Sequence, residues 1–490
     1  MCRFKLLLVV GSVLWLAACG SSNNGSTVTA VIATCFPSPI QSSQLITCTA
    51  TVTGTGVFMS TVNWTTTAGS INASGVFTAP VVTEPLSVTI TATSTQNTAV
   101  TGTATIIINP VNSQPLTVDA GPQPQTFTAV NEAFTSVTVC VPNSSTCQTV
   151  DHVLVDTGSS GLRLLSSVLT IPLPQENDAS GNPLDECHIF LDGYAWGPVS
   201  LADISVAGEI AASAAVQVMI PDSVSPAVPT TCSSQSIGPN QGNSVTALRA
   251  NGVIGLGFFQ HDCGVTCTTA NGSILPVYFD CSTSPCSPTY VTLAQQVPNP
   301  VTMFSLDNNG VLMFLPSVPS GGVSTLSGTL IFGIGTQTNN ALQGATVYTV
   351  PDTGANMGDI TTKFNGVSYP SSFIDSGSSG IFFLDNATTG IPTCTVQNSL
   401  WYCPIPSTGN LSATNQGTNG NQGVVNFSIN NANTLFNTGY SAFSTLGAPL
   451  VSAPPPGSFD WGLAFFFGRD VFTAIENMPT PGGPGPYVAY

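Results

Sequence analysis

Basic residues are almost missing from this chain of 490 residues. It carries only 6 Lys and Arg against 23 Asp and Glu, its formal net charge is -17, and charged residues of all kinds make up 6% of it. Nucleic acid and anionic lipid surfaces are bound by basic patches, so the composition argues against both as partners. Yet 42% of the residues are hydrophobic, which is too many for a disordered chain. The sequence therefore predicts a folded protein with an uncharged polar surface.

Long helical patterns are missing as well. After about residue 117, Thr, Val, Ser and Gly dominate, Pro occurs throughout, and no stretch keeps a helical period for more than two or three turns. The length is roughly three times the ~150 residues usual for one domain, so we expect two or three folded units. The predicted fold class is all-β.

The first residues have the pattern of a targeting signal. Arg3 and Lys5 precede an apolar run over residues 6–18, which is too short to span a bilayer but has the length of a signal-peptide core. Its end, Leu16-Ala17-Ala18-Cys19, resembles a bacterial lipobox. That resemblance implies a signal peptide of residues 1–18, lipidation of Cys19, and an exported protein anchored to the cell envelope, with the outer membrane favoured over the inner. The alternative is an ordinary secretory signal with an incidental Cys19.

The cysteine count fits an oxidising compartment. Fourteen cysteines are present, and twelve remain once Cys2 and Cys19 are set aside. An even number in mostly local sets predicts six disulfides, whereas a zinc site in the cluster is the alternative. The sets are Cys35 with Cys48, Cys140 with Cys147, Cys187 with Cys232, Cys394 with Cys403, and a cluster of Cys263, Cys267, Cys281 and Cys286, whose pairing stays open.

Composition divides the mature chain into parts. Residues 19–29 consist mostly of Ser, Asn, Gly and Thr, which predicts a flexible tether. Residues 30–110 show short alternating strands separated by Gly, Ser and Pro turns, the pattern of a β-sandwich, and they resemble a bacterial immunoglobulin-like repeat. Residues 111–117 are the predicted linker. The remaining chain is too long for one simple sandwich, so we expect it to form two lobes.

Two acidic residues in this last part stand in contexts that repeat each other. Leu154-Val155-Asp156-Thr157-Gly158-Ser159-Ser160-Gly161 is matched by Phe373-Ile374-Asp375-Ser376-Gly377-Ser378-Ser379-Gly380. In both, apolar residues predict a buried strand that ends at the Asp, and a tight turn then offers N–H and hydroxyl donors to its carboxylate. The pair predicts an internal duplication with one shared site. A third Asp-Thr-Gly, at Asp352, follows Pro351 and lacks the later hydroxyls, so we interpret it as a loop.

The matched turns resemble those of pepsin-like aspartic proteases. Further segments agree in order: Asn251–Gly257 resembles the strand behind the first Asp loop, and Phe466–Phe472 the strand behind the second. Between them, residues 291–306 resemble the interlobe helix and crossover strand, and 327–333 the start of the second lobe. The resemblance implies a bilobal fold with lobes at 118–300 and 301–490. The chain also resembles an exported bacterial lipoprotein family of unknown function.

The resemblance implies a catalytic pair, Asp156 and Asp375, that shares one proton and activates a water for hydrolysis of peptide bonds. This chemistry requires no metal or cofactor. Two carboxyl groups so close together cannot both ionise without a large electrostatic cost, and this is the physical basis of proton sharing. The supporting residues implied are Thr157 and Ser376, which brace the two turns, Ser159 and Ser378, which orient the carboxylates, and the turn glycines Gly158 and Gly377.

The chain departs from this family at the flap, the hairpin that closes over the catalytic pair. Arg163 stands where the family has a tryptophan, and Phe190 most naturally takes the place of the flap tyrosine. Tyr194 or Trp196 is the alternative in a shifted hairpin. A cation near the pair would favour ionisation of both carboxylates. Arg163 and Arg469 are therefore interpreted either as structurally paired or as binding an acidic ligand.

Three functions remain compatible with these observations. The first is a membrane-tethered aspartic endopeptidase acting on a peptide or protein substrate, favoured by the intact Asp pair. The second is a non-proteolytic pepsin-like protein that binds a peptide or glycan in the cell envelope, favoured by the altered flap. The third is adhesion or envelope organisation by the immunoglobulin-like part.

Overall fold

The computed structural model describes residues 25–82, 85–123, 127–236, 238–269, 276–395, 398–450 and 457–490. The predicted signal peptide, Cys19 and the first half of the predicted tether lie outside the described residues. The chain divides into two compact units, one formed by the residues up to Val81 with Leu86–Ile108, the other by Val82–Pro85 with Asn109–Tyr490. Among the described helices, none is long and apolar enough to cross a membrane.

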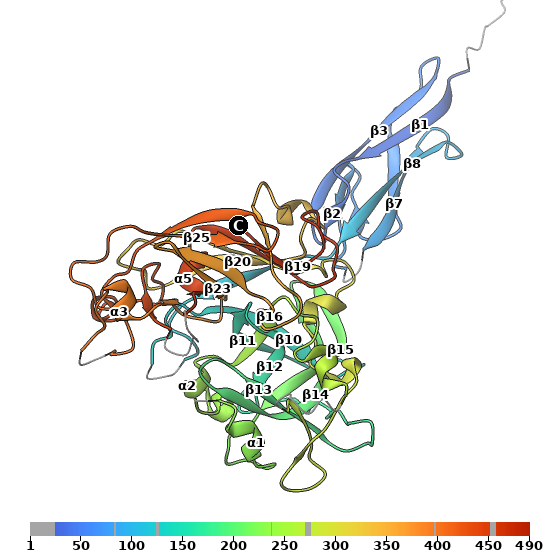
Figure 1. The fold of residues 1–490 in the computed structure, drawn as a ribbon. Helices are drawn as coiled ribbons and strands as arrows, with labels where there is room; N and C mark the ends of the chain where they lie inside the picture. The colour runs from blue at the N-terminus through green and yellow to red at the C-terminus, as the bar shows by residue number, and fades with distance from the viewer. Residues whose placement is uncertain are drawn as a thin grey trace, which may run out of the picture. The chain divides into compact units, whose positions relative to one another are not determined.

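The smaller unit consists of two four-stranded sheets whose strands run along its length (Figure 1). In β7 the side chains of Val88, Ile90 and Ala92 are fully buried, and the threonines between them are not. Since successive side chains of a strand point to opposite faces, this alternation gives each sheet one core face, and the strand pattern predicted here is confirmed. The first sheet runs β1 (Thr27–Cys35), β3 (Leu45–Thr55), β6 (Val76–Thr78), β5 (Ser70–Ile71); the second runs β2 (Ile40–Gln41), β8 (Thr101–Asn109), β7 (Leu86–Ser94), β4 (Val62–Thr66).

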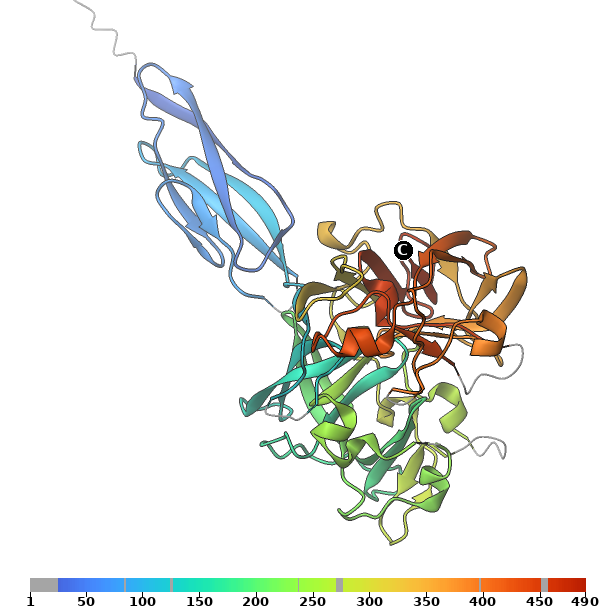
Figure 2. The same cartoon turned by 90° about the vertical axis from the view of Figure 1, so that its left-hand side faces the viewer.

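The larger unit contains a sheet of fifteen strands and one of seven. In Figures 1 and 2, its teal to yellow-green residues gather at one end and its orange to red residues at the other. The fifteen-stranded sheet runs β18 (Ser287–Pro288), β17 (Tyr278–Asp280), β13 (Leu184–Ile189), β14 (Tyr194–Val206), β15 (Glu209–Met219), β12 (Ser160–Leu165), β16 (Gly252–Leu256), β11 (Cys147–Asp156), β10 (Ala133–Cys140), β9 (Ser113–Val118), β20 (Leu326–Phe332), β19 (Gly310–Leu315), β29 (Arg469–Ala474), β30 (Tyr487–Ala489), β21 (Val347–Thr349). The other runs β26 (Gln422–Phe427), β25 (Leu411–Gln416), β22 (Ile360–Phe364), β23 (Val367–Ile374), β28 (Asp460–Trp461), β24 (Ile381–Phe383), β27 (Gly447–Pro449).

Helices are short throughout the described residues, as the sequence predicts. The α-helices are α1 (Thr230–Ser233), α2 (Val245–Leu248), α3 (Asn386–Thr389), α4 (Ala432–Phe436) and α5 (Leu463–Phe466). The 3-10 turns are η1 (Gln241–Asn243), η2 (Gly264–Cys267), η3 (Leu293–Gln295), η4 (Pro300–Met303) and η5 (Thr338–Asn340). The interlobe helix expected within 291–306 is therefore only the two turns η3 and η4. Proline has no N–H to donate, so Pro298 and Pro300 oppose a longer helix there.

Each half of the larger unit contains the same three-strand arrangement. In the first half β16 pairs parallel with β11 and antiparallel with β12, and in the second half β28 pairs parallel with β23 and antiparallel with β24. The strand that ends at each predicted catalytic Asp thus has a crossing strand beside it. The predicted internal duplication is confirmed at the level of strand pairing.

The crossing strand of the second half is not the predicted one. We expected it within Phe466–Phe472, but Ile374 of β23 is paired with Trp461 of β28. The predicted segment lies mostly in β29, whose strand partners are β19 and β30. The prediction was based on the short motif Gly468–Phe472. Strand pairing depends on contacts between segments far apart in the chain, which a short motif does not specify.

Strands of both halves meet in the fifteen-stranded sheet. β9 pairs with β10 of the first half on one side and with β20 of the second half on the other. Residues 113–118 therefore form part of the sheet, in place of most of the predicted linker at 111–117. One hydrophobic core runs through both halves and includes Leu116, Val153 and Trp461.

Six disulfides join the described cysteines. The four local pairs predicted from spacing are confirmed. In the cluster left open, Cys263 pairs with Cys267 and Cys281 with Cys286. All twelve sulfurs are thereby bonded to one another, which leaves no thiolate for the alternative zinc site. Six disulfides are typical of a protein that folds outside the cytoplasm.

Candidate active site

Asp156 ends the buried strand β11, where Val153 and Val155 are fully buried. The turn that follows supplies donors to both of its carboxylate oxygens. The Gly158 N–H donates to Oδ1 at 2.8 Å, and the Ser159 hydroxyl donates to Oδ2 at 2.5 Å. Hydrogen bonds to a carboxylate hold it in one orientation and stabilise its charged form.

Asp375, one residue after β23, has the same partners in the second half. The Gly377 N–H donates to Oδ1 at 2.8 Å, and the Ser378 hydroxyl donates to Oδ2 at 2.8 Å. Each carboxylate therefore accepts from the glycine two residues later and from the serine three residues later. This is the orienting geometry expected from the repeated sequence context.

Thr157 and Ser376 lie against each other across the two halves. The Thr157 N–H donates to Ser376 Oγ at 3.1 Å, and the Ser376 N–H donates to Thr157 Oγ1 at 3.0 Å. The Ser376 hydroxyl also donates to the Val155 carbonyl at 2.7 Å. These buried bonds join two turns that are far apart in the sequence and so fix the two Asp loops relative to each other.

The two carboxyl groups face each other across the turn glycines. A Cβ added at Gly158 would lie 2.8 Å from Cγ of Asp375, and one added at Gly377 would lie 2.7 Å from Oδ1 of Asp156. The close approach of the two turns therefore requires glycine at both positions. Burial raises the pKa of Asp375 well above its ordinary value, and the charge of Asp156 and the hydrogen bond between the two groups raise it further. Such a pair holds one proton and can act as acid and base together.

A third carboxyl group, Asp460, lies beside this pair. It is paired with Phe373 in β23, is 1% exposed, and its Oδ1 has no hydrogen-bond partner among the described residues. Burial raises its pKa well above the ordinary value, the charges of Asp375 and Asp156 add to this, and a hydrogen bond with Ser378 only partly opposes it. The surroundings of Asp460 therefore favour its neutral, protonated form.

Sequence reasoning missed Asp460 because it placed the second crossing strand a few residues too late. In the first half the corresponding residue is Val253, paired with Leu154 just as Asp460 is paired with Phe373. Aligning Val253-Ile254-Gly255 with Asp460-Trp461-Gly462 would have shown an acid in place of a valine.

Arg163 is the centre of a buried network close to the first Asp loop. It is completely buried and donates to the Glu186 carboxylate at 2.6 Å and to the Ser160 carbonyl at 2.7 Å. Its second acidic partner is Asp262, at 3.4 Å. Asp262 in turn accepts from the Tyr278 hydroxyl at 2.8 Å. Of the two interpretations of Arg163, the structural pairing is the one observed.

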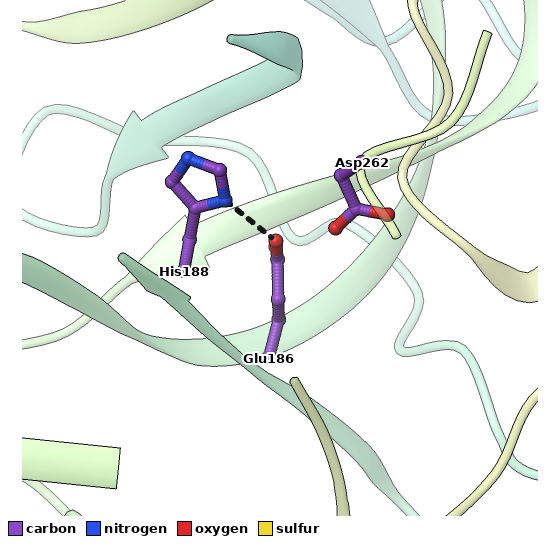
Figure 3. A group of neighbouring side chains, drawn as sticks. All are labelled: Glu186, His188 and Asp262. Carbon is purple, nitrogen blue, oxygen red and sulfur yellow. Dashed lines mark ion pairs between the residues drawn. The ribbon is translucent and has the colours of Figure 1, made fainter. Parts of the chain in front are cut away.

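His188, Glu186 and Asp262 approach one another in this network (Figure 3). Their ligand-type atoms all lie within 4.8 Å of one another, a spacing that by itself would suit a metal ion. However, the guanidinium of Arg163 already supplies a positive charge to both carboxyl groups. Burial and the charge of Glu186 raise the pKa of Asp262 well above its ordinary value, which favours its protonated form next to the Arg163–Glu186 ion pair. The cluster is an ion-pair network, and we assign no metal to it.

The two residues predicted for the flap lie in or next to the β13–β14 hairpin. Phe190 packs edge-on against the His188 ring, with 4.7 Å between ring centroids, and against a small core that includes Met219. The Tyr194 hydroxyl donates to Asp222 at 3.2 Å. His188 also lies on this hairpin, with its Nδ1 3.5 Å from Glu186 Oε1.

The remaining singled-out residues lie elsewhere. The Arg469 guanidinium lies 4.5 Å over the Phe465 ring, donates to the Phe465 carbonyl, and has no carboxylate partner among the described residues. Asp352 is exposed in an irregular loop, as predicted.

A cavity of about 910 Å³ in the larger unit is lined by residues of both halves, among them His152 and Ser441, but by none of the predicted site residues.

Comparisons with known proteins give three findings. A family model described as "Protein of unknown function (DUF3443)" matches residues 108–490. No curated protein matches the sequence. Among solved structures, the chain is similar to the crystal structure of the aspartic proteinase from Irpex lacteus, with 14% identity, a TM-score of 0.43, and coverage of 77% of this chain and 96% of that one.

Proposed function

The chain belongs to the DUF3443 family of proteins of unknown function, and we propose that its larger unit is an aspartic endopeptidase. The single observation that carries this proposal is the facing pair Asp156 and Asp375. Each carboxylate is held by matched donors, each is 7% exposed, and each lies against the turn glycine of the other half.

The mechanism follows from the shared proton. In the proposed cycle the ionised carboxylate takes a proton from a water, and the resulting nucleophile attacks the carbonyl carbon of the substrate peptide. The protonated carboxyl group donates its proton to the carbonyl oxygen as the C–O bond order falls. In the collapse, the carboxyl group that took the proton of the water gives it to the amide nitrogen, and the other carboxylate takes a proton from a hydroxyl of the intermediate. The C–N bond then breaks, which releases an amine and a carboxylic acid and restores the pair with its one shared proton. The raised pKa of Asp375 supports its role as the protonated partner at neutral pH.

We further propose that the protein is exported and held at the cell envelope by a lipid on Cys19, with the smaller unit acting as an immunoglobulin-like spacer. The six disulfides and the lipobox-like end of the signal support this arrangement. A peptide or protein substrate is the proposed partner, and the net charge of -17 opposes nucleic acid.

A second function is favoured by the hairpin beside the site. The network of Arg163 and Glu186, with Phe190 packed on His188, replaces the Trp and Tyr pair expected for an active flap. On this alternative, the fold binds a peptide or glycan without cutting it.

The experiment that separates the two is peptide-bond cleavage by the chain without residues 1–19. An unfolded protein is offered as substrate between pH 3 and 7, and Asp156→Asn and Asp375→Asn are measured beside the parent. Asp352→Asn is the matched control, because it removes the acid of the third, exposed Asp-Thr-Gly. Folding of every variant is checked by circular dichroism.

Cleavage by the parent and by Asp352→Asn, with at least 100-fold loss in both other variants, is the expected result. No cleavage by a folded parent protein would overturn the endopeptidase and favour the binding function. Equal activity in all four proteins would show that the cleavage comes from a contaminant.

A further inference from the structure

The inference concerns Arg469 and the pocket that it lines in the second half of the larger unit. This pocket has a volume of about 310 Å³, which lies within the range of small-molecule sites. Among the described residues that line it, none belongs to the catalytic pair or to its two turns. The pocket is therefore separate from the site described above.

Aromatic side chains form the buried part of the wall. The Trp461 ring lies against the rings of Phe427 and Phe465, with 5.3 and 5.6 Å between the ring centroids. All three residues line the pocket together with Ile381 of β24. Contact with such a wall removes apolar surface from water, so the pocket favours a ligand with an apolar body over a fully hydrated ion.

The positive charge in this pocket is not compensated. The guanidinium of Arg469 lies 4.5 Å over the Phe465 ring and donates through Nη1 to the Phe465 carbonyl. Its Nε and Nη2 donate to no described residue, and no described carboxylate lies within ion-pair distance of it. Burial lowers the pKa of Arg469, because a half-buried cation loses part of its hydration.

The other arginines that the structure describes each have acidic partners. Arg163 pairs with two buried acids, and Arg249 lies 3.6 Å from Glu132. Acids are abundant in a protein of net charge -17, yet Arg469 is paired with none of those described. A guanidinium with unused N–H groups is suited to a carboxylate, which it can bind through two parallel hydrogen bonds.

The rest of the wall is polar but uncharged. Ser317 and Asn410 are exposed at its edge, and Ser428 is half-buried. Ser317 lies close to the residue that precedes Arg469, since a Cβ added at Gly468 would lie 3.2 Å from the Ser317 Cβ. None of the described lining residues is acidic, so no negative charge competes with an anion for the guanidinium.

We propose that this pocket binds a small organic acid, with the carboxylate on Arg469 and the apolar body against the aromatic wall. A phosphate dianion suits the pocket less well, because it would meet one positive charge and an apolar surface. The proposal does not depend on the endopeptidase function, since the pocket contains neither catalytic Asp.

The first test is isothermal titration calorimetry with 3-phenylpropionate, a monocarboxylate with one aromatic ring. We expect the parent protein to bind it at pH 7. Binding should be about 10- to 100-fold weaker in Arg469→Gln, which loses the charge-assisted hydrogen bonds. Lys363→Gln is the matched control, because it removes one positive charge that does not line the pocket, and it should bind as the parent does.

Two further ligands test which group is recognised. The neutral amide 3-phenylpropionamide has the same shape and should bind about 10-fold more weakly than the acid. Equal binding of the amide and the acid, or equal binding of the acid by Arg469→Gln and the parent, would overturn the proposal. Tighter binding of inorganic phosphate than of the acid would overturn the assignment to a carboxylate. A folded parent protein that does not bind 3-phenylpropionate would also overturn the proposal.

The second test needs no variant. Phenylglyoxal modifies accessible guanidinium groups, and peptide mass spectrometry identifies the arginines that have reacted. Arg469 should react in the free protein, as should Arg249, whose side chain is 54% exposed. Adding 3-phenylpropionate should slow the reaction at Arg469 several-fold and leave Arg249 unchanged. An unchanged rate at Arg469, or equal slowing at both arginines, would contradict binding at this pocket.

Discussion

Asp460 should make the folded protein less stable as the pH rises, and its replacement should remove that effect. In the unfolded chain an aspartic acid ionises near pH 4. In the folded protein, burial and two neighbouring carboxyl groups raise the pKa of Asp460 well above this value. Above pH 4 the folded state therefore binds one proton more than the unfolded state, and the free energy of unfolding falls with pH.

The size of the effect follows from that one proton. While Asp460 stays protonated in the folded protein, each pH unit above 4 costs about 1.4 kcal/mol, or about 4 kcal/mol between pH 4 and 7. Other buried acids contribute to the pH dependence of the parent, but they are present in both proteins. The difference in unfolding free energy between Asp460→Asn and the parent therefore isolates this group, and it should grow in favour of the variant by up to about 1.4 kcal/mol per pH unit.

The assay is urea unfolding without reductant, followed by tryptophan fluorescence at pH 4, 5, 6 and 7. Asp460→Val, which copies Val253 of the first half, provides the control. The difference in unfolding free energy between Asp460→Val and the parent should grow with pH as it does for Asp460→Asn. The two variants should differ from each other only by an amount that does not depend on pH, since neither side chain titrates. If the unfolding free energies of the parent and both variants change with pH in parallel, Asp460 is not a buried neutral acid and the reasoning is wrong.

Three further predictions concern the braces, the disulfides and the anchor. Ser376→Ala leaves the buried Thr157 N–H without its partner, so the unfolding free energy should fall by about 1 to 3 kcal/mol in the same urea assay, together with kcat; an unchanged midpoint would contradict the bracing role. Removing the disulfide of Cys187 and Cys232, the one with the largest sequence separation, should cost about 2 to 5 kcal/mol, and alkylation that finds free thiols in the native parent would refute the pairing. Cys19→Ser should move the protein from the membrane to the soluble fraction of fractionated cells, and persistent membrane association would count against lipidation.

Much of the site could be predicted because its signals are local. The hydrogen bonds of Asp156 and Asp375 go to residues two and three positions later, so a short motif contains the whole turn. The four isolated disulfides and the alternating strands of the smaller unit are also local, since spacing and a period of two are enough to predict them.

The sequence by itself determined the fold class, the two Asp turns and the local cysteine pairs, because each depends on residues that are neighbours in the chain. Only the tertiary structure decided which strand crosses behind Asp375, that Asp460 lies at the site, and that His188 joins Arg163 through Glu186. These contacts connect segments tens to hundreds of residues apart. Their formation depends on strand pairing and on the neutralisation of buried charge, which no local pattern contains.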